Sequence, residues 1–115
     1  MKYTIIAAAA FALMSAGAMA QMQSMQPKVT DAASTKAFKD AQTKMMKSMD
    51  IEYTGNTDVD FVKGMLPHHQ GAIDMAKIEL ANGEDPELRK LAENIIKAQE
   101  KEIQVMQAWL KKNAK

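Results

Sequence analysis

The sequence predicts an all-α domain made of three main helices. Three stretches, at about 34–49, 57–82 and 86–112, repeat apolar residues at helical spacing. No stretch shows the apolar–polar alternation of a half-buried strand. Turn-forming residues separate the stretches, Gly55-Asn56 after the first and Asn82-Gly83 after the second. A chain of 115 residues suits one small domain, so we expect an antiparallel helical bundle.

The first twenty residues have the pattern of a cleaved bacterial signal peptide. Lys2 provides a positive start, the run from Ile5 to Met14 is apolar, and Ala18-Met19-Ala20 is a small-x-small cleavage site. The apolar run is too short for a stable transmembrane span. We therefore expect residues 1–20 to be removed and a mature periplasmic protein, without a membrane anchor, to begin at Gln21.

Residues 21–33 are predicted to be a disordered tail, because they are polar, contain Pro27 and show no apolar period. Met22 and Met25 lie on this tail. The helical domain is expected to occupy residues 34–115. Loss of Lys2 leaves fourteen basic residues against fourteen acidic ones, with no basic patch. Nucleic acid and anionic membranes are therefore not expected partners.

Cysteine is missing from the sequence, whereas methionine is abundant, with eleven in 115 residues. An exported domain without cysteine has no disulfides and depends on a packed core for its stability. Any soft metal ion would have to be bound by methionine and histidine. Methionine also fills cores, and that interpretation stays open for part of the set.

The first helix is expected to begin at an N-cap of Ser34 or Thr35 and to end near Met49. Its apolar stripe, with Met46 beside it, consists of Ala37, Phe38, Ala41, Met45 and Met49. Core packing explains such a stripe as readily as metal binding does.

The central helix carries both histidines of the chain, side by side, and is expected to be capped by Asn56 or Thr57. At about 100° per residue, His69 falls within the apolar stripe and His68 at its edge. Met65 precedes them by four and three residues, so it neighbours both on the helix surface. One thioether and two imidazoles on an apolar face favour a soft or borderline metal ion. Pro67 is expected either to kink this helix or to start a fresh one.

Met75 lies seven residues beyond His68, about 10 Å along the helix axis. It cannot share an ion with His68 through helical neighbourhood alone. It needs Met45 or Met49 of the first helix as a partner, or belongs to a second site.

The last helix is expected to begin with Asp85 as N-cap and Pro86 at its first position, and to run to about Lys112. Its inner side is predicted to hold Leu88, Leu91, Ala92, Ile95, Ile96, Gln99, Ile103, Met106, Trp109 and Leu110. Met106 has no histidine nearby in the sequence, so it is expected to pack and to contribute nothing to metal binding.

The segment Phe61-Val-Lys-Gly-Met65-Leu-Pro-His68-His69-Gln-Gly-Ala-Ile-Asp-Met75-Ala76 resembles the signature of the domain-of-unknown-function family numbered three hundred and five. The pattern from Leu91 to Leu110 is similar to the last helix of that family. The resemblance implies a ferritin-like helical bundle. It also implies a link to copper or silver, which some periplasmic members of the CopM type bind in tolerance systems.

Carried over by position, the resemblance implies Met65, His68, His69 and Met75 as ligands, with Met45 and Met49 as the methionine pair of the preceding helix. Met46, one turn from Met49, completes the candidate set. Longer family members carry the His-His unit twice, whereas this chain has it once. We therefore expect three helices per chain and a homodimer that completes the bundle.

The expected function is periplasmic binding of Cu(I), or of Ag(I), for copper buffering, trafficking or tolerance, with another copper-handling protein as partner. An enzyme is not expected. A di-iron oxidase needs a Glu-x-x-His unit, and the position three before His68 is Met65. The alternative is a metal-free helical chaperone whose Met-rich faces bind other proteins.

Overall fold

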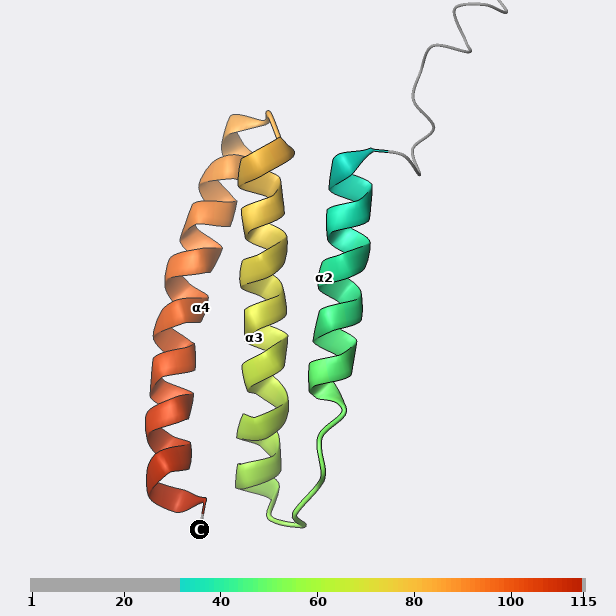
Figure 1. Ribbon diagram of the computed structural model, residues 1–115. Coiled ribbons are helices and arrows are strands. Elements are labelled where there is room, and N and C mark those ends of the chain that lie inside the picture. The colour runs from blue at the N-terminus through green and yellow to red at the C-terminus, as the bar shows by residue number, and fades with distance from the viewer. Residues whose placement is uncertain (1–31, 115) are drawn as a thin grey trace, which may run out of the picture.

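The computed structural model describes residues 32–114, and these form three helices joined by two loops (Figure 1). The helices are α2 at Ala33–Met49, α3 at Thr57–Asn82 and α4 at Pro86–Asn113. No strand occurs among residues 32–114, so the prediction of an all-α chain with three main helices is confirmed. The expected signal peptide, 1–20, and residues 21–31 of the expected tail lie outside the described residues.

The three helices lie side by side in a single layer with α3 in the middle (Figure 1). α3 packs against α2 on one side and α4 on the other, while α2 and α4 make no contact with each other. Neighbouring helices run in opposite directions, as short connections require. The arrangement is thus an open layer, and both of its broad sides lack a covering helix within residues 32–114.

α2 begins earlier than expected. Its N-cap is Ala32, which provides no side-chain hydrogen bond, and the helix starts at Ala33. The prediction that Ser34 or Thr35 is the N-cap is therefore wrong, since both lie in the first turn. Alanine has the highest helix propensity of all residues, so Ala32 and Ala33 extend the helix upstream.

The start of α3 is fixed by side-chain hydrogen bonds. The Asn56 carbonyl oxygen accepts from the backbone N–H groups of Asp58 and Val59, which confirms Asn56 as the cap. Asp60 accepts from the backbone and hydroxyl of Thr54 and from the Gly55 backbone. These hydrogen bonds, first of all that from the Thr54 backbone, lower the pKa of Asp60. Gly55 has φ of 83°, which suits glycine at this turn.

α3 runs without interruption through Pro67. The alternative in which Pro67 starts a fresh helix is therefore wrong, because Pro67 is inside the helix. The end of α3 at Asn82, followed by Gly83, and the Asp85 cap of α4 are as expected. Arg89 joins the two helices, since its Nη1 donates to the carbonyl oxygens of Leu80 and Gly83 at 2.8 and 2.9 Å.

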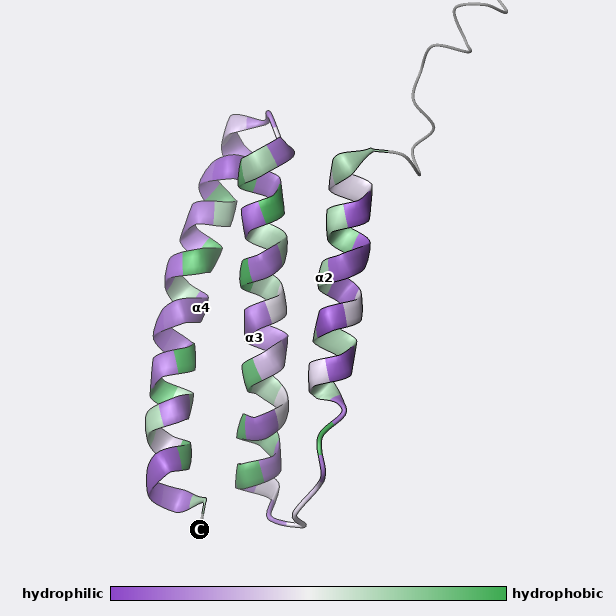
Figure 2. Cartoon of the chain, in the orientation of Figure 1, coloured by the Kyte–Doolittle hydropathy of each residue, from purple (hydrophilic) through white to green (hydrophobic). Residues whose placement is uncertain are grey.

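The buried side chains come mostly from the central helix, because only α3 has a neighbour on both sides. They include Val59, Val62, His69, Ile73 and Ala76 of α3 and Ala92 of α4. α2 contributes no buried residue. Hydrophobic positions recur along α3 and α4 between polar ones (Figure 2).

A second row of mostly apolar residues follows α3 and α4 on one broad side of the layer, which we call the open face. On α3 the row consists of Phe61, Met65, His68, Ala72, Met75 and Glu79. On α4 it consists of Leu88, Leu91, Ile95, Ala98, Glu102, Val105 and Trp109. Members of both rows line the same hollows, and Phe38 of α2 lines one of them too. Many of the large apolar side chains here are exposed.

Candidate metal centre

A groove of about 550 Å³ lies between α3 and α4 on the open face. Its lining consists of Phe61, Met65 and His69 from α3 and Ala98, Lys101, Glu102, Val105 and Met106 from α4. Met65 and His69 are four residues apart on one helix, and Glu102 and Met106 are four residues apart on the other. Residues at this spacing are neighbours on a helix surface. The groove therefore gathers two thioethers, one imidazole and one carboxylate.

His69 is almost buried, with 8% of its surface exposed, and both ring nitrogens have partners. Nδ1 lies 2.9 Å from the carbonyl oxygen of Met65, and Nε2 lies 2.5 Å from Oε2 of Glu102. A carbonyl oxygen only accepts, so Nδ1 carries a hydrogen and donates it. Nε2 is then the ring nitrogen that faces the Glu102 carboxylate. Nε2 and Oε2 form a hydrogen bond only when a proton lies between them.

The two adjacent histidines do not share the groove. His68 is exposed and is not part of the groove lining, whereas Met65 and His69 are. Successive residues of a helix differ by about 100°, so side chains of adjacent residues diverge. Within one chain the groove thus holds Met65 and His69 without His68, and the shared ion of both imidazoles stays a prediction. The expected burial of His69, with His68 at the stripe's edge, is confirmed.

Met45 and Met75 line a different hollow, between α2 and α3, together with Phe38 and Gly71. Met45 packs directly on the helix backbone, since a Cβ atom at Gly71 would lie 2.9 Å from its Cγ and 3.3 Å from its Cβ. Met75 is half exposed. Met75 therefore shares a hollow with Met45, whose close packing on Gly71 accounts for its place, and metal binding by this pair stays a prediction.

Met46 and Met49 are exposed on α2, at 63% and 39%. Neither of them lines the groove that holds Met65 and His69. Of the seven methionine and histidine candidates, the structure brings only Met65 and His69 together there.

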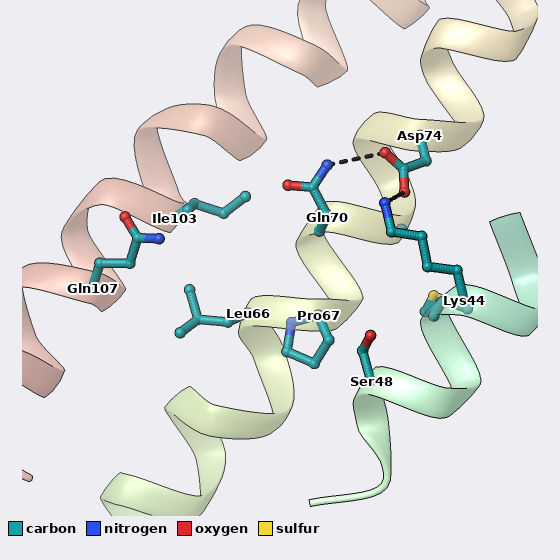
Figure 3. A pocket seen from close by; sticks show the side chains of 10 residues that line it. Lys44, Ser48, Leu66, Pro67, Gln70, Asp74, Ile103 and Gln107 are labelled. Atoms are coloured by element: carbon teal, nitrogen blue, oxygen red, sulfur yellow. Dashed lines mark hydrogen bonds and ion pairs between the residues drawn. The ribbon is translucent and has the colours of Figure 1, made fainter.

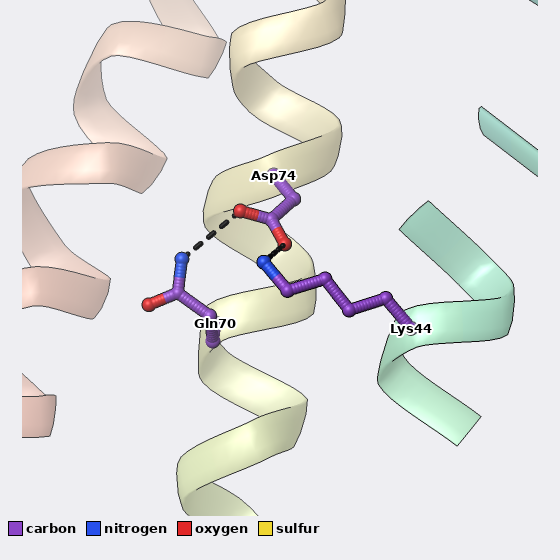
Figure 4. A network of polar contacts seen from close by, with 3 residues as sticks. All are labelled: Lys44, Gln70 and Asp74. Carbon is purple, nitrogen blue, oxygen red and sulfur yellow. Dashed lines mark hydrogen bonds and ion pairs between the residues drawn. The ribbon is translucent and has the colours of Figure 1, made fainter. Parts of the chain in front are cut away.

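The opposite side of the layer has a more polar hollow of about 250 Å³, which residues of all three helices line (Figure 3). Lys44 Nζ lies 3.3 Å from Oδ2 of Asp74, and the side-chain amide of Gln70 donates to Oδ1 at 3.0 Å (Figure 4). These contacts tie α2 to α3. Because Lys44 is largely exposed, its ion pair contributes less than about 1 kcal/mol.

Met106 and Glu102 were not identified from the sequence. Met106 has no histidine nearby in the sequence, yet it lines the groove with Met65 and His69 in the structure. The sequence predicts no role for Glu102. In the structure it contacts His69, although the two residues are 33 positions apart in the sequence. The four-residue spacing of Glu102 and Met106 predicts that they share a face of α4. It does not predict which residues of α3 that face contacts.

Residues 32–114 contain no cluster of three or more histidine, aspartate and glutamate side chains with the placement of a metal site. Within the same range, no helix combines the length and the apolar character that crossing a membrane requires.

Comparison with known proteins gives two similarities. Over 53 residues the chain is 40% identical to an uncharacterized protein, L153, of Acanthamoeba polyphaga mimivirus, which covers 46% of this chain. The chain spans about a third of that relative, since the match covers 35% of its length. The family described as "Domain of unknown function (DUF305)" matches residues 8–110, and so includes all of α2 and α3 and most of α4. The chain therefore belongs to the DUF305 family.

Proposed function

We propose that this protein binds a soft monovalent metal ion, Cu(I) or Ag(I), in the groove between α3 and α4. The observation that supports this most strongly is the lining of the groove, where Met65 and His69 meet Met106. Thioether sulfur is a soft, neutral ligand and imidazole is borderline, so the set favours Cu(I) and Ag(I) over Zn(II) and Fe(II). The role is buffering, trafficking or tolerance of copper in the periplasm, with a copper-handling protein as partner.

The hydrogen bonds of His69 support a ligand role. Ligating histidines usually donate their second ring N–H to a carbonyl or carboxylate, which fixes the tautomer and the orientation of the ring. In this protein Nδ1 donates to the Met65 carbonyl, and Nε2 is left as the atom that faces Glu102. A metal ion that uses Nε2 takes the place of the proton between Nε2 and the carboxylate.

Glu102 makes the ligand set less soft than the sequence alone indicates. Its side chain is 60% exposed, so it can turn toward water or stay beside the ion as an anionic ligand. A carboxylate suits harder ions such as Cu(II). The set of two thioethers, one imidazole and one carboxylate is therefore suited to a copper site that tolerates both oxidation states but prefers Cu(I).

We propose binding rather than catalysis as the function. The chain has no Glu-x-x-His unit, which a ferritin-like di-iron oxidase would need. A second candidate function is a metal-free helical interaction module. The observation that favours it is the row of exposed apolar side chains on the open face, including Phe61, Leu91 and Val105.

Thermal unfolding with different metal ions separates the two functions. A ligand at a hundred times its dissociation constant stabilises the folded state by about 2.7 kcal/mol, a clear increase in melting temperature. We expect this with Cu(I) under reducing conditions and with Ag(I), and much smaller shifts with Zn(II) or Fe(II). Equal or greater stabilisation by Zn(II) would contradict the soft site. No shift with any of the four ions would favour the interaction module.

A further inference from the structure

We propose that a second copy of this chain covers the open face, with its α4 antiparallel to the first α4 about a two-fold axis near Ala98. The groove with Met65, His69 and Met106 is then closed between two copies.

α4 has two rows of residues with heptad spacing. One row, with Ala92, Gln99, Ile103, Met106 and Leu110, belongs to the side that packs on α3. The other is the α4 row of the open face, which starts at Leu88 and advances by three and four residues in alternation. This spacing is the pattern of a helix that packs against another helix. No helix of residues 32–114 lies on that side.

The exposure of this row is unusual for a surface. Leu88 and Leu91 are each 52% exposed and Val105 is 64% exposed. Single exposed apolar residues are normal, but several of them along one row mark an interaction surface. The row runs along most of α4, so an occupant of helical length is needed to cover it.

The α4 row of the open face can also pack against the same row of a second copy that runs in the opposite direction. Its middle residue, Ala98, is the smallest, and the bulky residues Leu91 and Val105 lie on either side of it. On α3 the two central residues of the row are His68 and Ala72, so one of them is also small. Small residues at the centre let two copies approach closely, as expected where a two-fold axis passes. The Leu91 end of one copy then meets the Val105 end of the other.

The two ends of α4 carry opposite charges. The first turn carries Glu87, and the last turn carries Lys111 and Lys112. Antiparallel packing places the acidic end of one α4 beside the basic end of the other. Parallel packing would place like charges together and is disfavoured. This complementarity favours a second copy as the occupant of the open face.

Closure of the groove by a second copy would bring His68 close to the metal site, an inference that rests on the proposed function. His68 lies in the middle of the α3 row and is exposed within one chain. In the dimer it lies between the copies, where its imidazole can reach the partner's half of the interface. The exposed histidine that a single chain leaves out of the groove therefore becomes part of an enclosed site.

Light scattering and one pair of variants test the interface without any metal. We expect the purified protein to have twice the chain mass at micromolar concentration. Val105→Lys should give a monomer of unchanged helix content, because the side chain is mostly exposed within one chain. Met46→Lys is the matched control, since Met46 is 63% exposed on α2 and lines none of the hollows of the open face. It should remain dimeric. A monomeric parent protein, or a dimeric Val105→Lys variant, would overturn the proposal.

Because the parent chain has no cysteine, single-cysteine variants report only contacts between copies. With a short thiol cross-linker, Ala98→Cys should form covalent dimers. Leu88→Cys should not, because antiparallel packing separates residue 88 from its counterpart by about 30 Å, at 1.5 Å per residue. Gln107→Cys, which lines the hollow on the opposite side, should not either. Cross-linking of Leu88→Cys, or its failure at Ala98→Cys, would overturn the antiparallel arrangement.

The two proposals fail in different experiments. A metal-free dimer that shows no thermal shift with Cu(I) or Ag(I) supports the interface and contradicts the metal function. A monomer that is stabilised by Cu(I) supports the metal function and contradicts the interface.

Discussion

His69 of α3 and Glu102 of α4 face each other in the groove of the open face, with 2.5 Å between Nε2 and Oε2. The imidazole side chain is 10% exposed and the carboxylate side chain 60% exposed, so a nearly buried group contacts one that water reaches. Each residue lies well inside its helix, so the pair is one of the contacts through which α4 packs on α3. The metal-ligand hypothesis and the packing of the two helices therefore depend on the same contact.

Replacement of Glu102 by alanine should lower the free energy of unfolding by about 1 kcal/mol, since it removes the partner of a nearly buried imidazole nitrogen. Leaving a buried polar group without a partner costs about 1–3 kcal/mol. The low end applies here because the carboxylate is more than half exposed and is screened by solvent. Urea unfolding at neutral pH measures the difference. Glu100→Ala is the control, because Glu100 is exposed on the same helix and lies outside the groove. Equal effects of both changes would show that the His69 contact adds no stability.

Met65→Leu and Met106→Leu should each weaken Cu(I) binding by about tenfold or more, equivalent to about 1.4 kcal/mol. Leucine keeps the size and apolarity of methionine, so each change should cost less than about 1.5 kcal/mol of stability. Competition with a chromophoric Cu(I) chelator measures the affinity. Met46→Leu should leave the affinity unchanged, as Met46 is exposed on α2. If Met106→Leu binds as tightly as the parent, Met106 is a packing residue and the groove is not the site.

The two glycines inside α3 should respond to alanine with opposite signs. At Gly64 the nearest atom to an added Cβ is 3.9 Å away, so Gly64→Ala should stabilise the protein by about 0.5–1 kcal/mol through helix propensity. At Gly71 the added Cβ would collide with the Met45 side chain, and overpacking costs about 1–3 kcal/mol. Gly71→Ala should therefore destabilise the protein. Thermal unfolding of the two variants makes the comparison, and stabilisation by Gly71→Ala would show that α2 is free to shift.

Asp60→Asn should destabilise the protein in a pH-dependent way. The pKa of Asp60 is below its unfolded value of 3.8, chiefly because the Thr54 backbone and hydroxyl donate to its carboxylate. A lowered folded-state pKa contributes stability that is present above pH 3.8 and is lost as the pH falls through the folded-state value. The difference between parent and variant should thus be full at neutral pH and shrink in acid.

Denaturant unfolding from pH 7 to about pH 2 follows this loss across the titration of the carboxylates. Asp58→Asn is the control, because it removes a charge from the same helix end but none of the Thr54 contacts. It therefore distinguishes the effect of the Asp60 hydrogen bonds on stability from that of the helix dipole. A difference for Asp60→Asn that stays constant across the range would contradict the role of the ionised carboxylate.

Most of the secondary structure could be predicted because helix ends depend on residues close together in the chain. The Asn56 and Asp85 caps and the stop at Asn82-Gly83 each satisfy backbone groups within four positions. The cap of α2 was mispredicted for the same local reason, since two alanines upstream extend the helix past the polar residues.

The shared face of Met65 and His69 on α3 also follows from the sequence, because residues four apart on a helix are neighbours. The residues that this face contacts depend on how α4 packs against α3. The position of α4 along α3 results from many weak packing contacts rather than from any local pattern. It is this packing that brings Glu102 and Met106 to His69, leaves His68 exposed, and lays the three helices in an open layer.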